Sequence, residues 1–349
     1  MKNILKILII SIILFVFMFN ISILVNADVP SYEIVIDEES GRILHAVNEN
    51  DIRPMASTTK IVTCITVIDN CDVKREVEIK EEWVNIEGSS MYLKKGEVLS
   101  VEELLYGLML RSGNDCAVAL ACFVSGSIDS FALKMQEIAD KAGAENSSFK
   151  NPHGLDCEGH YTTVKDLAFI TRYAMKNDLF KKIVSTKKIA IGRGENRRIL
   201  YNKNKLLNNY EYATGVKTGY TKKAGRCLVS SSSKEGFNLI CVVFNCGPMF
   251  ERSEELLNSA YKKYKRIKLL SKDSSVGEVV SKRGNLLPAY VNEDLYFPLS
   301  EGELNEVDFQ LNPYKKEQIL EKFNQEIGTI KIFFKKQLLF ERKIFTIIV

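Results

Sequence analysis

Histidine is scarce in this chain of 349 residues, which contains only His45, His153 and His160. A Ser-His-Asp triad needs a histidine base, so a hydrolase of that type is not expected. His153 and His160 flank Cys157, but their spacing matches no common zinc pattern, and we expect neither a metal nor another cofactor. Both histidines are predicted to be structural, and His160 is expected to order a loop.

An excess of charge of one sign is also missing. Two of the 48 Lys and Arg residues, Lys2 and Lys6, lie in the first 27 positions, which hold no Asp or Glu. The other 46 nearly balance the 44 acidic residues. Nucleic acid is therefore not an expected partner, because a protein that binds it needs a strong basic excess. Basic runs such as residues 261–266 are interpreted as solvated helix faces.

The eight cysteines do not form a disulfide pattern. Cys64, Cys116, Cys122 and Cys241 lie inside apolar runs, where cysteine behaves as a small hydrophobic residue. A chain of this length can bury a large core, so disulfides are not needed for its stability. The sequence therefore favours mostly free thiols.

A long apolar run is present at the N-terminus. Lys2 and Lys6 precede it, residues 7–19 are apolar apart from Ser11, and the small-residue pattern of a cleavage site lies at positions 25–27. These features predict an export signal over residues 1–27. A retained membrane anchor is the alternative, because an apolar segment of about 20 residues spans a bilayer. Either way, the rest of the chain is expected outside the cytoplasm, secreted or held at the outer face of the membrane.

Three short motifs follow one another along the chain: Ser57-Thr58-Thr59-Lys60, Ser112-Gly113-Asn114 and Lys217-Thr218-Gly219. Together they offer a serine nucleophile, a lysine that can take its proton, a polar relay and a cationic clamp for a carboxylate. An acyl-transfer enzyme without a histidine base needs these parts.

The first motif is common by itself. Ser-x-x-Lys also occurs at residues 147–150, 185–188, 231–234 and 259–262, all in polar surroundings. Ser57 differs because it opens the apolar run 61–68, which predicts a buried helix. The mouth of such a helix presents unpaired N–H groups, and Lys60 lies over the same face. Ser57 is therefore the candidate nucleophile.

The pattern of segments predicts an α+β fold with two domains. A hairpin is expected over 31–46, short strand or loop pieces at 77–79 and 91–93, and later strands at 212–216, 227–232 and 238–244. Between and after them we expect helices from Ser57 onward and at 104–110, 115–123, 130–142, 163–176 and 251–266. Ser100 and Glu103 have the spacing of a capping box that leads into the helix at 104–110. This order indicates an antiparallel sheet flanked by helix layers over residues 28–265. Strand-length segments over 268–349 predict a small β-rich C-terminal domain.

The three motifs resemble those of the low-molecular-weight penicillin-binding proteins, the serine D-alanyl-D-alanine carboxypeptidases. Stretches at 88–96, 151–155, 159–161 and 221–225 are similar to that family as well, so the resemblance covers roughly residues 28–265. It implies removal of the terminal D-alanine from peptidoglycan stem peptides through an acyl-enzyme, and inhibition by β-lactam antibiotics. Family members often end in an amphipathic membrane helix. None is recognisable here, so membrane association would depend on residues 1–25.

The resemblance also implies roles for single residues. Ser57 would be acylated, Lys60 would act as general base, and Ser112 with Asn114 would relay a proton and hold the substrate amide. Lys217 would support the electrostatic field, and Thr218, together with Lys217 and Lys203, would recognise the terminal carboxylate. Gly219 belongs to the same motif, and the backbone N–H groups of Ser57 and Tyr220 would form the oxyanion hole. A lysine base must be uncharged, which burial and the nearby Lys217 ammonium both favour.

Two other functions are compatible with the motifs. A β-lactamase would use the same nucleophile but needs a glutamate in a Glu-x-x-Leu-Asn arrangement, which residues 195–199 do not match. A catalytically silent envelope scaffold would be favoured by loss of Ser57, Lys60 or Lys217, and all three are present. The carboxypeptidase is the preferred hypothesis.

Overall fold

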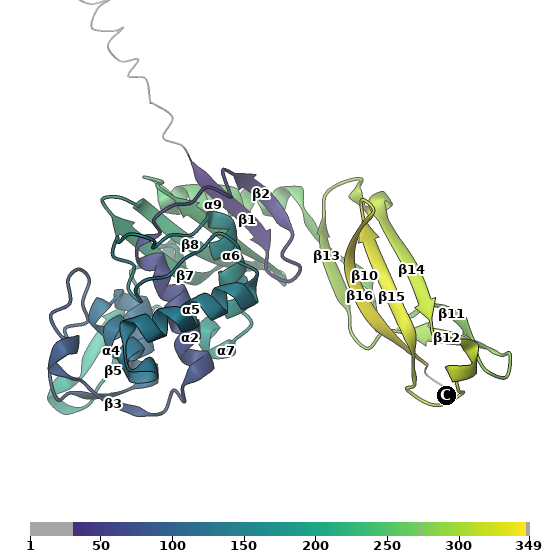
Figure 1. Cartoon of the computed structure of the whole chain (residues 1–349). Helices are drawn as coiled ribbons and strands as arrows, with labels where there is room; N and C mark the ends of the chain where they lie inside the picture. The colour runs from purple at the N-terminus through teal and green to yellow at the C-terminus, as the bar shows by residue number, and fades with distance from the viewer. Residues whose placement is uncertain (1–30, 273, 347–349) are drawn as a thin grey trace, which may run out of the picture. The chain divides into compact units, whose positions relative to one another are not determined.

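The structure is a computed structural model that describes residues 31–272 and 274–346. The predicted leader, residues 1–27, lies outside this part. The first described strands join much later ones in a five-stranded antiparallel sheet with the order β2-β1-β9-β8-β7 (Figure 1). The strands are β1 (Tyr32–Asp37), β2 (Ile43–Val47), β7 (Ala213–Thr221), β8 (Gly225–Lys234) and β9 (Phe237–Phe244). β7, which carries the third motif, is therefore an edge strand.

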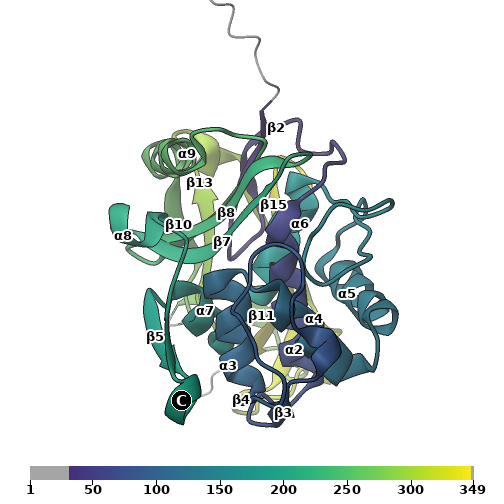
Figure 2. The same cartoon turned by 90° about the vertical axis from the view of Figure 1, so that its left-hand side faces the viewer.

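Helices cover both faces of this sheet, as Figure 2 shows from the side. Alternate side chains of a strand point to opposite faces, so Ile34 and Ile36 join one hydrophobic cluster and Val35 joins another. The helix α9 (Met249–Lys263) packs on the Val35 face. On the opposite face, α2 (Lys60–Asn70), α6 (Val164–Ala174) and α7 (Asp178–Ser185) contact the sheet, and α4 (Asn114–Ser125) and α5 (Ile128–Ala142) pack against α2.

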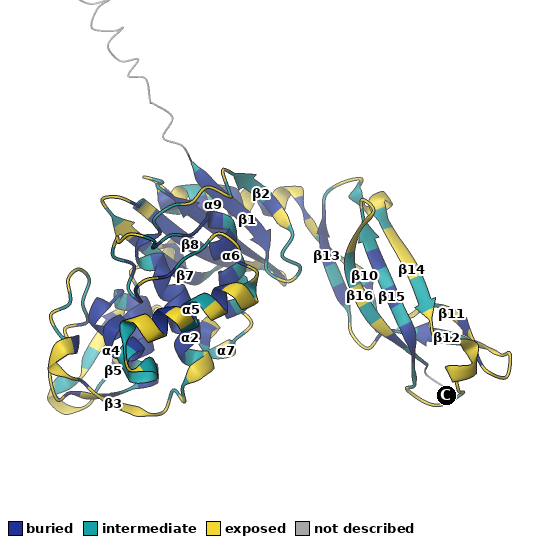
Figure 3. Cartoon of the chain, viewed as in Figure 1, coloured by how far each residue is buried: buried dark blue, intermediate teal, exposed yellow. Residues whose placement is uncertain are grey.

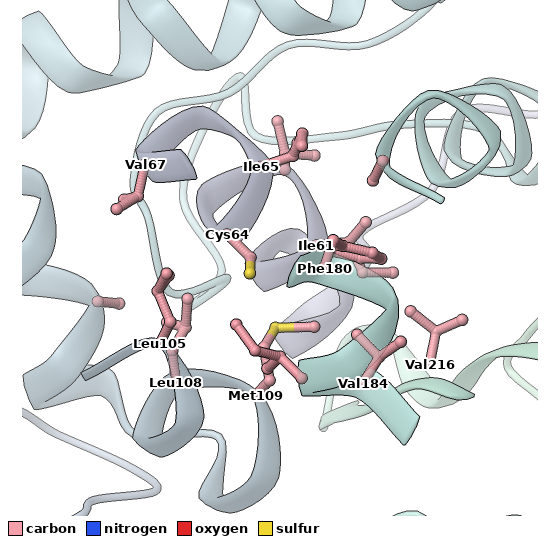
Figure 4. Packing of buried hydrophobic residues seen from close by; sticks show 14 of the residues in the cluster. Ile61, Cys64, Ile65, Val67, Leu105, Leu108, Met109, Phe180, Val184 and Val216 are labelled. Atoms are coloured by element: carbon pink, nitrogen blue, oxygen red, sulfur yellow. The ribbon is translucent and has the colours of Figure 1, made fainter. Parts of the chain in front are cut away.

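The helix α2 is the centre of the larger cluster. Every residue from Lys60 to Val67 is buried, which confirms the buried helix predicted from the apolar run (Figure 3). Figure 4 shows Ile61, Cys64 and Ile65 of α2 among buried side chains of other segments, which are Leu105, Leu108, Met109, Phe180, Val184 and Val216. The start of α2 is thus fixed by contacts all round. All eight cysteines are free thiols, in agreement with the prediction.

Shorter elements complete this part of the chain. They are β3 (Glu76–Glu78) paired with β4 (Val98–Ser100), α3 (Val101–Tyr106) with the π-helical turn Gly107–Arg111, β5 (Lys188–Ile191) paired with β6 (Arg198–Tyr201), and α8 (Leu206–Asn209). Among the described residues, no single helix is long and apolar enough to cross a membrane. α4 and α5 meet that test only as a pair bent by 88°.

The C-terminal segment is β-rich, as predicted. β10 (Lys265–Leu270) pairs with β13 (Leu295–Leu299), and a five-stranded sheet has the order β11-β12-β16-β15-β14. Its strands are β11 (Ser275–Val280), β12 (Leu286–Tyr290), β14 (Val307–Pro313), β15 (Glu326–Phe334) and β16 (Gln337–Thr346). Residues from 269 to 344 have a hydrophobic cluster of their own. The boundary near residues 265–268 stays a prediction.

Some elements differ from the sequence predictions. β7 runs through the third motif to Thr221 instead of ending at residue 216, and α9 covers 249–263 instead of 251–266. Residues 91–93, predicted as a short strand or loop piece, are a loop, in which the Asp115 carboxylate accepts hydrogen bonds from the Met91 and Leu93 amides. The helix α7 and the hairpin β5–β6 were not predicted.

The capping box at the start of α3 is confirmed. The Ser100 hydroxyl accepts from the Glu103 amide, and the Glu103 carboxylate accepts from the Ser100 amide. We expect Ser100→Ala to lower the free energy of unfolding by about 1 kcal/mol, because a helix N–H loses its partner. Urea denaturation measures this change. Ser127→Ala is a matched comparison, because it removes the N-cap serine of α5 in the same way. An unchanged midpoint for Ser100→Ala would contradict the expectation.

Candidate active site

Ser57 lies on a tight 3-10 turn, Ala56–Thr59, that leads directly into α2. The turn is held by the Thr58 hydroxyl, which donates to the Met55 carbonyl at 2.6 Å, and the Thr59 hydroxyl, which donates to the Ala56 carbonyl at 2.8 Å. Ala56 adopts a φ of 49°, which is left-handed backbone and costs an alanine roughly 1–2 kcal/mol. The buried helix after it keeps the nucleophile in this conformation.

Lys60 is fully buried and its amine touches three oxygens. Nζ lies 2.7 Å from Asn114 Oδ1, 2.6 Å from the His153 carbonyl and 3.0 Å from Ser57 Oγ. The first two oxygens can only accept hydrogen bonds, so they use both N–H groups of a neutral amine. Its lone pair then remains for the Ser57 hydroxyl. The geometry therefore suits an uncharged lysine that takes the proton of Ser57.

The electrostatics favour the same protonation state. Burial, and after it the charge of Lys217, hold the pKa of Lys60 well below its usual range. Lys217 is itself buried, and burial followed by repulsion from Lys203 lowers its pKa to about 7. Its Nζ donates to the Thr218 carbonyl at 2.9 Å. Among the described residues it makes no hydrogen bond to Ser57 or Lys60, so it acts on them through its field.

The loop that offers the His153 carbonyl is braced by Asn151. The Asn151 Oδ1 atom accepts from the amides of Gly154 at 2.7 Å and His153 at 3.3 Å, and its Nδ2 donates to the Leu155 carbonyl. Gly154 has a φ of +91°, and a Cβ there would lie 1.9 Å from the Ala56 carbonyl oxygen. In the sequence, this stretch is recognisable only by its resemblance to the carboxypeptidase family. Its contact with Lys60 was missed, because a main-chain carbonyl leaves no side-chain signal.

Asn114, the first residue of α4, is bound to the base. Its Oδ1 accepts from Lys60, and its Nδ2 donates to the Glu87 carbonyl at 2.5 Å. Both ends of this buried side chain are therefore engaged inside the protein. The predicted contact of Asn114 with a substrate amide stays a prediction, and its role in this structure is to orient Lys60.

Ser112 lies between the π-helical turn and α4, and its backbone is left-handed, with a φ of 63°. Its side chain borders the same cavity as Ser57. Within residues 31–272 and 274–346 the Ser112 hydroxyl has no hydrogen-bond partner. It is thus open to a substrate, and the predicted relay to Lys60 is not formed here.

A cavity of about 460 Å³ opens beside the nucleophile. Its wall includes the remaining predicted residues, which are Lys203, Thr218, Gly219 and Tyr220. A Cβ at Gly219 would lie 3.1 Å from the Ser57 amide nitrogen, so a side chain at this position would crowd the turn that carries Ser57. Lys203 donates to the Ser89 hydroxyl at 3.1 Å. The structure therefore brings every predicted site residue except the buried Lys60, Asn114 and Lys217 onto one cavity, and those three lie behind it.

His160 braces the turn from the other side, in agreement with its predicted structural role. Its Nε2 lies 3.0 Å from the Thr59 hydroxyl oxygen, and its Nδ1 accepts from the Lys150 amide at 3.0 Å. Burial lowers the pKa of His160 to about 4, and burial is also the main cause that lowers the pKa of His153 to about 4. Both rings are neutral near neutral pH.

A serine at the start of a buried helix, a lysine within hydrogen-bond reach of it and a buried lysine on the adjacent edge strand are the arrangement expected of penicillin-recognising serine enzymes. Comparison with known proteins narrows the class. Residues 26–247 match the family model of D-alanyl-D-alanine carboxypeptidase. The chain belongs to this family of serine-type carboxypeptidases, penicillin-binding hydrolases that remove D-alanine from the stem peptides of the cell wall.

Individual relatives agree. The chain is 31% identical to the D-alanyl-D-alanine carboxypeptidase DacF of Bacillus subtilis, over 85% of this chain and 79% of the relative. It is 30% identical to DacA of Escherichia coli, over 87% of this chain and 79% of the relative. Among solved structures, penicillin binding protein 5 of Haemophilus influenzae superposes with a TM-score of 0.74 at 25% identity. That match covers 90% of this chain and 96% of the other.

The buried histidines predict acid sensitivity. The folded state keeps His160 neutral down to about pH 4, whereas the unfolded chain binds a proton near pH 6.5. Stability is therefore lost as the pH falls from about 6.5 to 4. We expect His160→Asn to lower the slope of unfolding free energy against pH in this window by about 1.4 kcal/mol per pH unit, one proton's worth. Urea titrations at several pH values test this, with His45→Asn as the control. The same slope in His160→Asn as in the unaltered chain would contradict the prediction.

Proposed function

We propose that Ser57 carries the acyl group of the D-Ala-D-Ala reaction and that Lys60 is its general base. The observation that supports this is the Lys60 amine, whose two N–H groups are taken by Asn114 and His153 while Ser57 Oγ lies 3.0 Å away. An amine held in this way transfers a proton without first breaking another contact. Asn114 acts as a positioning residue for the base.

The reaction proceeds in two halves. In the first, the Ser57 oxygen attacks the carbonyl of the penultimate D-alanine while its proton moves to Lys60. The peptide C–N bond then breaks, and the leaving amine of the terminal D-alanine takes a proton from the Lys60 ammonium, with the free Ser112 hydroxyl as a relay. In the second half, water gives a proton to Lys60 and attacks the ester carbonyl. The bond from that carbon to Ser57 Oγ then breaks, Lys60 returns the proton to Ser57 Oγ, and the shortened peptide leaves as a carboxylic acid.

Charge on the reacting carbonyl oxygen is stabilised by the backbone N–H groups of Ser57 and Tyr220. The close approach of Gly219 to the Ser57 amide supports this pairing of a turn with an edge strand. Each donor of such a hole contributes about 3–4 kcal/mol. Thr218 and Lys203, on the wall of the same cavity, bind the terminal carboxylate, and Lys217 behind them supplies positive field.

A β-lactam presents the same carboxylate and a strained amide, so we propose that it acylates Ser57 and is released slowly. Fast release, as in a β-lactamase, needs a carboxylate that activates water. Among the described residues that line the cavity there is no Asp or Glu. Glu195 lies in the turn Gly194–Asn196, outside this lining. The carboxypeptidase remains favoured over the lactamase.

The place of action follows from the substrate. Stem peptides with D-Ala-D-Ala ends belong to the cell wall, and residues 1–27 have the pattern of an export signal. We propose that the chain is exported and works outside the cytoplasm, cleaved or held to the membrane through residues 1–25. Residues 28–265 form the catalytic domain, and 268–349 form a separate β-rich domain.

Labelling with a fluorescent penicillin tests the nucleophile. The purified protein is expected to keep the label through denaturing electrophoresis, and peptide mapping is expected to place it on Ser57. Ser57→Ala should take no label and should release no D-alanine from a peptide ending in D-Ala-D-Ala. Ser231→Ala, another serine of a Ser-x-x-Lys sequence, is the matched control. A stable adduct on another residue, or rapid turnover of the drug without an adduct, would refute the proposal.

The effect of Lys217 on the base predicts a shift in pH dependence. Lys217→Gln removes a positive charge near Lys60, so the pKa of Lys60 rises and the acid limb of the acylation rate moves to higher pH. The rate constant for penicillin acylation is measured from pH 5 to 10. Its dependence on pH gives the position of the acid limb even when the absolute rate falls. Lys222→Gln, at an exposed position just after β7, should leave the limb in place. A limb that moves to lower pH would contradict the prediction.

A further inference from the structure

The cavity beside Ser57 holds more positive charge than the terminal carboxylate requires. Lys203, Lys205 and Arg226 all lie on its wall, and its described lining contains no Asp or Glu. Lys203 is engaged with Ser89. The side chains of Lys205 and Arg226 make no hydrogen bond or ion pair within residues 31–272 and 274–346. Two cations at the reaction cavity thus have no protein partner.

The position of Arg226 relates it to one end of the substrate. Tyr220 of β7 lies directly opposite Arg226 of β8, so their side chains share a face of the sheet. Thr218 is two residues back along β7, a distance of about 7 Å. Met249 and Phe250, at the start of α9, complete this side of the cavity with apolar surface.

The direction of the bound peptide follows from the proposed function, on which this inference rests. The terminal carboxylate occupies Thr218 and Lys203, and the carbonyl one residue earlier faces the Tyr220 amide. The peptide therefore extends from Thr218 past Tyr220 as it is followed toward its N-terminus. Arg226 lies on that side, beside the part of the stem that stays on the enzyme as the acyl group.

We propose that Arg226, assisted by Lys205, binds a second carboxylate, carried by the donor part of the stem peptide. The preferred substrates are then stems whose second or third residue keeps a free carboxylate, and stems in which that group is a carboxamide are poorer. A guanidinium pairs with a carboxylate through two parallel hydrogen bonds, which an amide cannot reproduce. Because both cations are exposed, the preference weakens as ionic strength rises.

The test uses three peptides that end in D-Ala-D-Ala. One has free carboxylates on both its D-glutamyl second residue and its diamino-dicarboxylic third residue, and each of the others has one of these groups as the carboxamide. We expect the full chain to favour the free acid over one of the two amides by about tenfold in kcat/KM, mainly through KM. The amide with the lower kcat/KM identifies the carboxylate that the enzyme binds.

Substitution separates a specific subsite from general attraction. Arg226→Gln is expected to bring the ratio of acid to amide close to one, and Lys205→Gln to lower it in part. Lys223→Gln, in the exposed turn between β7 and β8, removes the same charge away from the cavity lining and should keep the tenfold ratio. A ratio near one in the unaltered chain, or equal loss in Lys223→Gln and Arg226→Gln, would overturn the subsite.

Binding without turnover keeps this test independent of the catalytic proposal. In the Ser57→Ala background, calorimetry should show tighter binding of the free acid than of the amide, and Arg226→Gln should abolish the difference. This difference in affinity supports the subsite whether or not the unaltered chain releases D-alanine. Failure to release D-alanine would refute only the proposed reaction. Equal affinity for the peptides in that background would refute the subsite alone.

Discussion

An uncharged amine buried under a serine hydroxyl is the interaction on which the rest of this site depends. A lysine that is taken fully out of water loses the hydration of its charge, and it remains stable there only as a neutral, hydrogen-bonded amine. The chain meets this requirement with two carbonyl oxygens from distant segments, Asn114 of α4 and His153 of a loop. Burial therefore keeps Lys60 in the unprotonated form that a general base needs, because it lowers the pKa of the amine.

The supporting structure is a set of rigid contacts around one turn. Thr58 and Thr59 hold the turn through their own hydroxyl groups, His160 bonds to it from another segment, and Gly219 and Gly154 let a strand and a loop approach it closely. Two of the site residues, Ala56 and Ser112, have left-handed backbone, which is maintained only where the surroundings determine it. The deep burial of α2 provides those surroundings, so core stability and reactivity have one origin.

Much of this could be predicted from the sequence, because the features concerned are local. The apolar run after Ser57 indicated a buried helix, Ser100 with Glu103 indicated a capping box, and the order of strands and helices indicated the fold class. Features that depend on contacts between distant parts of the chain were not predicted. The Asp115 carboxylate, which binds the amides of the loop at 91–93, and the His153 carbonyl act across long stretches of chain. The extension of β7 through Lys217-Thr218-Gly219 was also missed, since strand ends depend on pairing with β8.

The loop beneath Lys60 combines a main-chain contact with a steric one, and the two differ in how freely evolution can alter them. At position 153 the Lys60 amine is met by a carbonyl that every amino acid possesses, so this contact by itself does not require histidine. At position 154 a methyl group would collide with the carbonyl of Ala56, so descendants of this sequence are confined to glycine. Neighbouring positions of one catalytic loop thus carry opposite mutational tolerance.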